Sequence, residues 1–439
     1  MKRTISRAFR SLLLSCALLA ASMLGGGPAF AAPHVQPSGR VTRWVNVRQD
    51  PGTGSAIIGR ILPGESADLI AVGPGWYEVR LSDGRTGYVS RGWVTRIEEA
   101  AVAGAVYRVH LIDVGTGLSV FVEGPGFALL YDAGSNDDNA TGARNRVLAY
   151  IRHVRPDLTT LDHVILSHPH QDHVALLPDI LMIYQVRNVW DSGRDYKNCQ
   201  YHAFLRVVRD KHIPYHDADT LTGPHVAHVP AAICSGRHEP AEDIIVPHAA
   251  HIALGTPVPL GPGASMTFLH ADPSPAVRTP NENSLVMALD VGASRVLFMG
   301  DAQAGERADP AVAPDPRWTE GKLLDCCLAQ LRSDVLIAGH HGSETSSRTR
   351  TLDAIGAYLF LVSSGPYKYS GTSLPDKAVI DEFKRRGTVF RTDSDDASCR
   401  TAPAKIGPDN DNEPGGCDNV VVTIDAAGHI SAAYDRSSD

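Results

Sequence analysis

The apolar stretches that follow residue 40 are short and are separated by turn-forming residues. Turn signals such as Pro51-Gly52, Pro63-Gly64 and Asp83-Gly84 interrupt them, and no helical period spans residues 41–97. Short apolar runs bounded by Gly, Pro and Asp are typical of β-strands joined by tight turns. We predict a small all-β module at residues 41–97, preceded by a short polar tail at residues 32–40 and followed by an alanine-rich linker at residues 98–106.

From residue 107 the pattern changes to apolar runs of strand length that alternate with helical stretches, as in α/β proteins. The predicted strands are residues 106–114, 119–123, 127–131, 163–166, 265–269, 284–290, 295–299, 334–338 and 358–362, and the predicted helices are residues 174–184 and 377–386. Asp132, His168, Asp301 and His341 each follow a predicted strand. Because strand ends can meet at one edge of a sheet sandwich, we expect these side chains to converge within a domain at residues 107–437.

The first 31 residues have the pattern of a signal peptide. Four basic residues precede an apolar run at residues 11–24, which is too short to span a bilayer comfortably, and Ala29-Phe30-Ala31 is a cleavage signal. We expect cleavage after Ala31 and export to the periplasm or the cell exterior, with no integral membrane segment in the mature chain. A retained N-terminal anchor is the alternative.

Cleavage changes the charge of the chain. It lowers the count of Lys plus Arg from 41 to 37 against 49 Asp plus Glu, so the formal charge falls from −8 to −12. Tight sequence-independent binding of nucleic acid needs a basic surface, which this balance argues against. A nuclease whose metal ions meet the phosphate is still compatible with it.

Export also bears on the cysteines, of which six of the seven lie beyond the signal peptide. An even number in an exported chain fits disulfides. Cys399 and Cys417 bracket a loop rich in Pro, Gly, Asp and Asn that no apolar core would hold, so we predict a disulfide between them. Cys199 with Cys234 is a second candidate pair, whereas the adjacent Cys326 and Cys327 could equally be buried thiols.

The run from Ser167 to His173 carries the chemistry. His168-Pro169-His170-Gln171-Asp172-His173 places three imidazoles and one carboxylate within six residues. A buried loop cannot hold such a set without a cation, because unpaired polar groups cost several kcal/mol each. Imidazole suits zinc, copper, iron and nickel. The spacing lets His168 and His170 bind one ion while Asp172 and His173 reach a second; a histidine-rich surface loop is the alternative.

This H-x-H-x-D-H spacing resembles the metallo-β-lactamase superfamily. The expected accompanying motifs occur in the right order: Asp132-Ala133-Gly134, Gly300-Asp301 and Gly339-His340-His341-Gly342-Ser343. The resemblance implies an α/β fold, an αβ/βα sandwich. The all-β module resembles bacterial SH3 domains at Val45-Asn46-Val47-Arg48, Gly75-Trp76-Tyr77-Glu78-Val79 and Gly87-Tyr88-Val89. The chain is therefore expected to be a metallo-β-lactamase sandwich preceded by a small SH3-like barrel.

The resemblance also implies a ligand set for two zinc ions, with manganese or iron as other metals. By it, His168, His170 and a third histidine hold the first ion, Asp172 and His173 hold the second, and Asp301 bridges both. His270 is the expected third histidine, with His248 and His251 as alternatives. Two ions would lower the pKa of a shared water and create hydroxide. Asp132 is expected to orient a ligand histidine.

His340 and His341 are adjacent, and side chains of adjacent extended residues point apart. One is therefore expected to bind metal while the other faces substrate. We favour His341 as the ligand, because Gly342 follows it directly, and His340 as a contact to phosphate or leaving group. Asp172 and His340 are thus the expected catalytic residues.

Further motifs look like the hydrolase domain of ComEC-type DNA-uptake competence proteins. These are residues 109–115, 281–286, 339–343, 363–365 and 391–393. The chain departs from that branch at Thr116 and Leu118, where Gln and Asp are usual, and it lacks a histidine soon after Tyr369. We expect a phosphodiesterase acting on a small phosphodiester or nucleic acid, with cell-wall peptide bound through the SH3-like module, where Trp76 and Tyr88 form an aromatic platform or part of the core. The alternatives are hydrolysis of a β-lactam or another ester or amide, and a wall-binding protein with a vestigial metal domain.

Overall fold

The computed structural model describes residues 34–72, 75–81, 84–97, 104–219, 223–234, 236–393 and 418–435. The predicted signal peptide at residues 1–31 and the predicted disulfide between Cys399 and Cys417 lie outside these residues, so both stay predictions. Among the described residues, no helix has the length and apolar character needed to cross a membrane.

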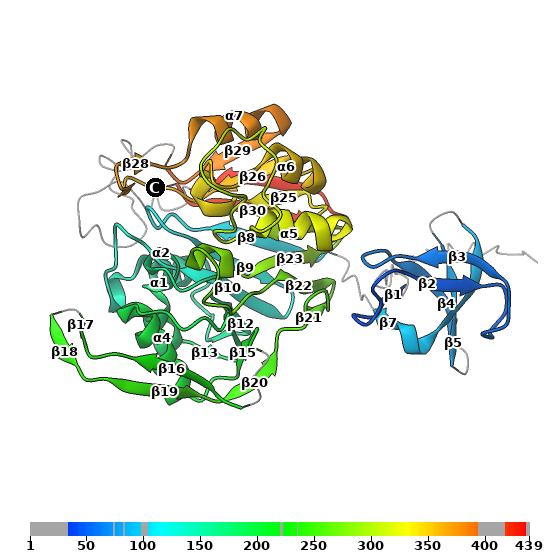
Figure 1. Ribbon diagram of the computed structural model, residues 1–439, viewed down its shortest axis with the longest axis horizontal. Helices are drawn as coiled ribbons and strands as arrows, with labels where there is room; N and C mark the ends of the chain where they lie inside the picture. The colour runs from blue at the N-terminus through cyan, green and yellow to red at the C-terminus, as the bar shows by residue number, and fades with distance from the viewer. Residues whose placement is uncertain are drawn as a thin grey trace, which may run out of the picture.

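The N-terminal module is an antiparallel sheet of seven strands, drawn in blue in Figure 1. Its strands are β1 (His34–Pro37), β2 (Val45–Arg48), β3 (Ile57–Ile61), β4 (Ala67–Val72), β5 (Trp76–Arg80), β6 (Thr86–Ser90) and β7 (Val94–Ile97), with a short 3₁₀ helix, η1 (Arg91–Trp93). Alternate residues of these strands point inward, and Val47, Val79 and Val89 are fully buried in a shared core. The prediction of an all-β module is confirmed.

The module begins earlier than the sequence suggested. Residues 32–40 were expected to be a polar tail, but β1 pairs with both β4 and β7 and buries Val35 completely. Pro37 ends the strand, and the polar character of its flanks hid a strand of only four residues.

Trp76 and Tyr88 lie on the same face of β5 and β6. Their neighbours Tyr77 and Val89 point into the core, whereas Trp76 and Tyr88 are half-buried on the outer side. Because successive side chains of a strand point to opposite faces, neither residue can reach the core. The expectation of a core role is therefore wrong, and the arrangement favours an outward aromatic surface.

The large domain contains two mixed sheets. The first has nine strands in the order β20 (His248–His251), β15 (Tyr215–Asp217), β14 (Val189–Trp190), β12 (His163–Ile165), β10 (Phe127–Ala133), β9 (Ser119–Gly124), β8 (Val106–Leu111), β30 (Val420–Asp425) and β31 (Ile430–Tyr434). The second has seven strands in the order β21 (Val258–Gly261), β22 (Ala264–His270), β23 (Val286–Val291), β24 (Ser294–Phe298), β25 (Val335–Ile337), β26 (Leu359–Val362) and β29 (Thr388–Arg391). Strands β20 to β10 of the first sheet run parallel, as do strands β24 to β29 of the second.

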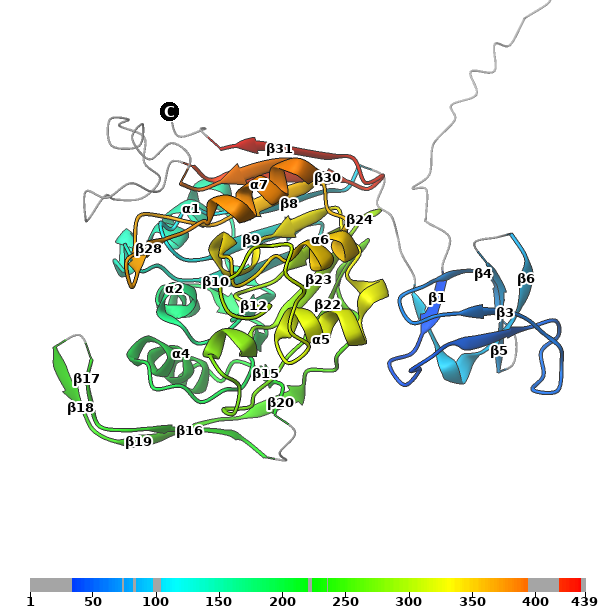
Figure 2. The ribbon, with the colours of Figure 1, turned by 45° about the horizontal axis from the view of Figure 1, so that its top comes forward.

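Helices cover the outer face of each sheet, as Figures 1 and 2 show. The helices beside the first sheet are α1 (Arg146–Val154), α2 (Gln171–Val174), α3 (Leu177–Ile183) and α4 (Cys199–Asp210), and those beside the second are α5 (Thr319–Cys326), α6 (Thr349–Ile355) and α7 (Lys377–Arg386). The remaining short elements are η2 (Gly142–Arg144), η3 (Pro280–Asn283), η4 (Leu328–Gln330), η5 (Gly339–Gly342), the pair β11 (Thr160–Leu161) and β13 (Gln185–Val186), and the pair β27 (Lys368–Tyr369) and β28 (Thr372–Ser373).

The buried residues divide into one apolar layer between the two sheets and one between each sheet and its helices. On β10, Leu129 packs between the two sheets while Leu130 packs under the helices, and on β26 Leu361 and Phe360 divide in the same way. Strands buried on both faces read as continuous apolar runs, which is how they were recognised in the sequence. The αβ/βα sandwich is confirmed.

One predicted helix is divided in two. The helix expected at residues 174–184 begins earlier, at Gln171, and stops at Val174 before α3 starts at Leu177. Pro178 lies in the first turn of α3, where its missing N–H is tolerated, but that same lack prevents one continuous helix. The short α2 therefore carries Asp172 and His173 on its first turn.

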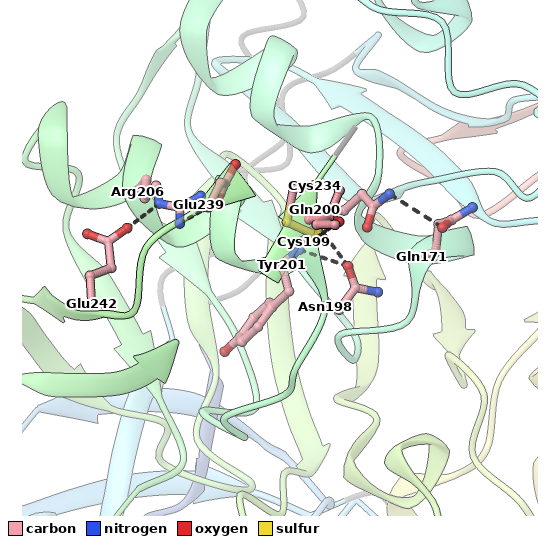
Figure 3. Close-up of a disulfide and its surroundings, with 10 residues drawn as sticks. Gln171, Asn198, Cys199, Gln200, Tyr201, Arg206, Cys234, Glu239 and Glu242 are labelled. Atoms are coloured by element: carbon pink, nitrogen blue, oxygen red, sulfur yellow. Dashed lines mark hydrogen bonds and ion pairs between the residues drawn. A yellow bond between two sulfur atoms is a disulfide. The ribbon is translucent and has the colours of Figure 1, made fainter. Parts of the chain in front are cut away.

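Between β15 and β20 the chain leaves the sheet as a long antiparallel arm, seen in green at the lower left of Figure 1. The arm consists of β16 (His225–Val229), β17 (Ala232–Cys234), β18 (Arg237–Glu239) and β19 (Glu242–Val246). A disulfide joins Cys234 near its tip to Cys199 at the start of α4 (Figure 3). The second candidate pair of the sequence is thus present.

Cys326 and Cys327 also form a disulfide with each other. The sequence left open that they were buried thiols, and this is wrong, since Cys326 is exposed and Cys327 only half-buried.

Candidate metal centre

The candidate ligands come from strand ends of both sheets. His168 follows β12 of the first sheet, while Asp301 follows β24 and His341 follows β25 of the second. Because the parallel strands of each sheet end at the same edge, residues far apart in sequence meet there. Gly134 permits the close packing, since a Cβ atom at this position would lie 2.3 Å from the backbone nitrogen of His173.

Two groups of ligand atoms form at this edge. We call His168, His170 and Asp301 the first group, and Asp172, His173 and His341 the second group. Within each group the ligand atoms all lie within 4.8 Å of one another. Each group therefore has the size of a single metal site.

Asp301 faces both groups. Its Oδ2 lies 3.7 Å from Nε2 of His168, and its Oδ1 lies 3.2 Å from Nε2 of His173 and 3.7 Å from Nε2 of His341. The carboxylate is almost fully buried, with 3% of its surface exposed. One oxygen for each group is the arrangement that a bridging ligand needs.

The neighbours of the imidazoles fix which ring nitrogen faces inward. Nδ1 of His341 lies 3.1 Å from the carbonyl oxygen of Ser363, and since a carbonyl only accepts, Nδ1 carries the proton and Nε2 is free. Nδ1 of His173 donates in the same way to Oδ2 of Asp132, over 2.8 Å. Both rings thus turn Nε2, and not Nδ1, toward the centre.

Asp132 is itself held firmly. It is fully buried, its Oδ1 accepts from the backbone N–H of Ser167 at 2.6 Å, and its Oδ2 accepts from the Ser167 hydroxyl at 2.7 Å. The hydroxyl oxygen in turn lies 3.0 Å from Nδ1 of His168. Asp132 and Ser167 therefore orient one histidine of each group without facing the centre themselves.

The charges at the centre are strongly coupled. Burial alone would lower the pKa of His173, but Asp301 and Asp132 outweigh it and raise that pKa well above its usual value. Burial would likewise raise the pKa of Asp301, yet His173 and His341 hold it well below its ordinary range. Since metal ligands must be deprotonated, protons compete with a cation for these same nitrogens.

His340 and His341 do not have the extended backbone that the sequence analysis assumed. Their φ angles are 49° and 54°, in the left-handed region, with Gly339 and Gly342 on either side. A non-glycine residue there costs on the order of 1–3 kcal/mol, so the surrounding contacts must hold the turn. The two side chains still diverge: His341 joins the second group, and His340 does not.

His340 lies in a polar cage. Its Nδ1 lies 2.6 Å from Oγ1 of Thr345 and 3.1 Å from Nε2 of Gln303, and its Nε2 lies 3.1 Å from Nδ2 of Asn281. Nε2 is also 3.9 Å from Oδ2 of Asp301. The side chain is 19% exposed, so it stands at the boundary between the centre and solvent.

Two residues that the sequence analysis did not assign hold Asp172. The hydroxyl of Tyr369 donates to Oδ2 of Asp172, and Nδ2 of Asn136 donates to the same oxygen at 3.1 Å. Tyr369 comes from the β27–β28 hairpin, where the sequence drew attention only by a missing histidine. Asn136 comes only four residues after Asp132. This closeness in sequence to a motif residue was the signal that could have identified it.

The predicted third histidine, His270, is not a member of either group. Nδ1 of His270 lies 2.9 Å from the carbonyl oxygen of Ser284, and burial together with nearby Lys322 lowers its pKa. The alternatives His248 and His251 belong to a different cluster with Asp217. The structure therefore gives the first group two histidines, and the role of His270 stays a prediction.

The residues present fit two cations. Nε2 of His173, Nε2 of His341 and Oδ1 of Asp301 are buried and have no hydrogen-bond partner among the described residues. Unpaired buried polar atoms are costly, and three that face each other fit a cation bound between them. Imidazole with carboxylate is a donor set that zinc accepts.

Comparison with known proteins agrees with this donor set. The sequence profile of the metallo-beta-lactamase superfamily matches residues 112–356, more than half of the chain, and includes both groups. The chain belongs to the metallo-beta-lactamase superfamily. Its members are generally metal-dependent hydrolases. The profile of the bacterial SH3 domain matches residues 44–95.

Two curated relatives are similar to the large domain. Recombination protein 2 of Haemophilus influenzae is 26% identical over 280 residues, which cover 64% of this chain and 26% of that protein. The uncharacterized protein YcaI of Escherichia coli is 23% identical over 283 residues, covering 64% of this chain and 28% of that protein. The chain thus spans little more than a quarter of the length of these relatives, and the first match supports the competence-type branch.

Among solved structures, the metallo-beta-lactamase fold protein YhfI from Bacillus subtilis is 14% identical, with a TM-score of 0.37. The alignment covers 66% of this chain and 97% of that chain.

The contacts of Asp132 lead to a prediction. Replacing it in Asp132→Asn keeps the size and an acceptor for Ser167 but removes the charge that orients His173. Zinc affinity, measured by competition with a chelator, is expected to fall by about 10- to 100-fold while the fold is retained.

Asp162 provides the matched control for Asp132, because it accepts from the backbone N–H of Ala128 at the opposite end of the same strands. Asp162→Asn is expected to leave zinc affinity unchanged. Equal zinc affinity in the two variants would contradict the orienting role of Asp132.

Proposed function

We propose that this chain is an exported dinuclear zinc hydrolase that cleaves phosphodiesters. The observation that carries the proposal is the position of Asp301, whose two carboxylate oxygens face two separate groups of imidazoles. Two-metal sites of this kind are used for displacement at phosphate, because two ions can stabilise the negative charge on both the attacking and the leaving oxygen.

The chain's own residues divide into three roles. The first and second groups hold the two ions, which when bound would activate water and neutralise charge on the substrate. Tyr369 and Asn136 keep the Asp172 carboxylate in place, so that it stays aimed at the centre. His340, at the solvent boundary and fixed by Thr345, is positioned to contact the phosphate or the leaving group.

A nearby positive charge supports an anionic substrate. The ring of Tyr196 packs on His170 with centroids 5.5 Å apart, and the guanidinium of Arg194 lies 5.9 Å from the centroid of the Tyr196 ring. Nη1 of Arg194 donates to Asn283, which lies in η3 together with Asn281. Arg194 thus flanks the first group. Its guanidinium is held in place there and can bind the negative charge of a phosphodiester.

The likeness to Recombination protein 2 also favours a phosphodiester over a β-lactam. The net negative charge of the chain argues against a long nucleic-acid footprint, so a small phosphodiester or a single strand is the better fit. Two ligand groups that come together around Asp301 argue against a vestigial metal domain.

Export and wall binding rest on other features. Two disulfides in the described part of the chain fit an oxidising compartment, the periplasm or the cell exterior. The SH3 domain presents Trp76 and Tyr88 on one outer face, where a cell-wall peptide can pack. We infer that the domain retains the enzyme on the wall.

A substrate panel tests the proposed activity. Mature protein replete with zinc is expected to hold about two zinc ions and to hydrolyse an aryl phosphodiester or single-stranded DNA faster than a β-lactam. Asp301→Ala should lose bound metal and about 10³-fold or more of activity, because it removes a ligand of both ions. His270→Ala should lose about tenfold at most.

Three results of that panel would contradict the proposal. Less than half an equivalent of zinc in metal-replete protein excludes two ions. Equal and mild losses in Asp301→Ala and His270→Ala exclude the bridge. Faster turnover of the β-lactam makes β-lactam hydrolysis the function.

The position of Arg194 gives a second test. Arg194→Gln is expected to raise KM for the phosphodiester by about tenfold with kcat little changed, since it removes a charge that binds the anion. The exposed Arg187, paired with Asp162, is the matched control. If Arg194→Gln and Arg187→Gln have the same KM as wild type, Arg194 does not bind substrate.

The SH3 domain is expected to be separable from catalysis, because every candidate ligand lies in the large domain. A chain lacking residues 32–104 should hydrolyse a small soluble phosphodiester at nearly the wild-type rate but lose retention on isolated cell wall. A truncated protein that keeps two metals yet loses most of its activity would place the domain in the active site instead.

A further inference from the structure

A second set of metal-binding side chains lies outside the candidate metal centre. It consists of Asp217 at the end of β15 and His248 and His251 on β20, and we call it the edge cluster. Its three ligand atoms all lie within 4.8 Å of one another, as in the two groups of the centre. β20 is the outermost strand of the nine-stranded sheet.

A register shift brings the two histidines together. Residues three apart on a regular strand point to opposite faces, so His248 and His251 would be separated by the sheet. The pairing of β15 with β20 runs Tyr215 to His248 but Asp217 to His251, with an irregularity between them. This extra residue turns both rings to one side, where their centroids lie 4.4 Å apart. Bulges that re-aim side chains are typical of functional sites.

The contacts within the edge cluster do not amount to a hydrogen-bond network. Nε2 of His248 lies 2.9 Å from Oδ1 of Asp217 yet makes no hydrogen bond with any described residue, and this nitrogen is buried. His173 and His341 have the same feature in the candidate metal centre. Two ligands of one ion lie close together without pointing at each other, because both point at the ion. Nε2 of His248 and Oδ1 of Asp217 have this arrangement.

The surroundings favour a cation. Asp217 is 1% exposed, and its Oδ2 lies 3.3 Å from Nδ1 of His225, so His225 and His248 approach different oxygens of the carboxylate. Asp195 and Asp219 line the same cavity of about 400 Å³. Three carboxylates in one cavity favour a cation between them, beside the imidazoles of His225 and His228 that line it too.

We propose that Asp217, His248 and His251 bind a third divalent transition-metal ion, of the zinc class, distinct from the two ions of the candidate metal centre. Two imidazoles and one carboxylate are the ligands that zinc prefers, whereas magnesium and calcium favour oxygen alone. Three protein ligands leave one position of a tetrahedron for water from the cavity. The proposal does not depend on which substrate the enzyme cleaves.

The position of the site indicates what the ion does. The arm leaves the sheet just after Asp217 and returns at His248, so an ion held by both residues closes the base of the arm (Figures 1 and 2). The disulfide between Cys199 and Cys234 fastens the arm to α4 nearer its tip (Figure 3). The ion and the disulfide together would fix both ends of the arm, whose inward side chains, such as Ala227 and Ile244, pack into the same core as α4.

The experiment uses the full mature chain with its candidate metal centre removed. A background variant that combines His168→Ala, His173→Ala and Asp301→Ala is loaded with zinc, dialysed, and analysed for metal content, with circular dichroism to verify the fold. It is expected to retain about one zinc ion per chain, and about one cobalt ion with the absorption of a tetrahedral site when cobalt is used instead. Adding His251→Ala should lower zinc affinity by at least about tenfold.

His228 offers the matched control. It is an exposed histidine at the edge of the same cavity but pairs with Asp243 instead of Asp217. In the background variant, His228→Ala should keep the bound ion. His251→Ala alone should leave phosphodiester turnover unchanged, because it touches neither group of the candidate metal centre.

Three outcomes would overturn the proposal. If the folded background variant retains neither zinc nor cobalt, the edge cluster is a set of ion pairs and not a metal site. Zinc affinity unchanged by His251→Ala places the ion elsewhere. Equal losses from His251→Ala and His228→Ala indicate loose binding to surface histidines instead of a built site.

Discussion

The Asp301 carboxylate is the feature on which the active-site edge depends. It is buried among three imidazoles, and its two oxygens face two different ligand groups. A charge in such a position is tolerated only if positive charge surrounds it, from protons on the histidines or from bound cations. The edge meets this requirement by bringing together ends of different sheets, since His168 follows β12 of the first sheet and Asp301 follows β24 of the second.

The meeting of the two strand ends depends on the apolar core between the two sheets. Leu129 of β10 and Ile337 of β25 pack against each other's sheets in one apolar layer, which sets how the ends of the two sheets face one another. A shift of one sheet against the other by a single residue would move His168 away from Asp301 as well as exposing apolar surface. Packing in the middle of the sandwich therefore fixes the distances at its edge.

Much of this could be predicted from sequence, because the signals were local. The H-x-H-x-D-H spacing placed His168 and His173 at a strand end, and long apolar runs located the strands that are buried on both faces. The sequence did not predict features that depend on backbone geometry, such as the turn at His340 and the strand β1. The left-handed turn at His340 has no signature beyond its flanking glycines, and β1 is too short and too polar at its ends to show a period.

Other misses came from contacts made across the fold. Tyr369 reaches Asp172 from a hairpin that begins far along the chain, so no local pattern linked them. His248 and His251 were the alternatives to His270 as third histidine of the first ion. Only the register shift against β15 shows that they face Asp217 instead. Pairing register is set by the whole sheet, which a single sequence does not reveal.

The two metal-binding regions meet at one loop. Arg194 and Tyr196 lie beside His170, while a Cβ atom at Gly193 would lie 3.0 Å from Cβ of Asp217. The loop can pass between them only because Gly193 has no side chain and accepts a φ of 82°. A side chain at position 193 would press on Asp217, so the loop beside the first group needs glycine there. The close approach thus joins the edge of the sheet, the base of the arm and the charge that flanks the first group into a single packed unit.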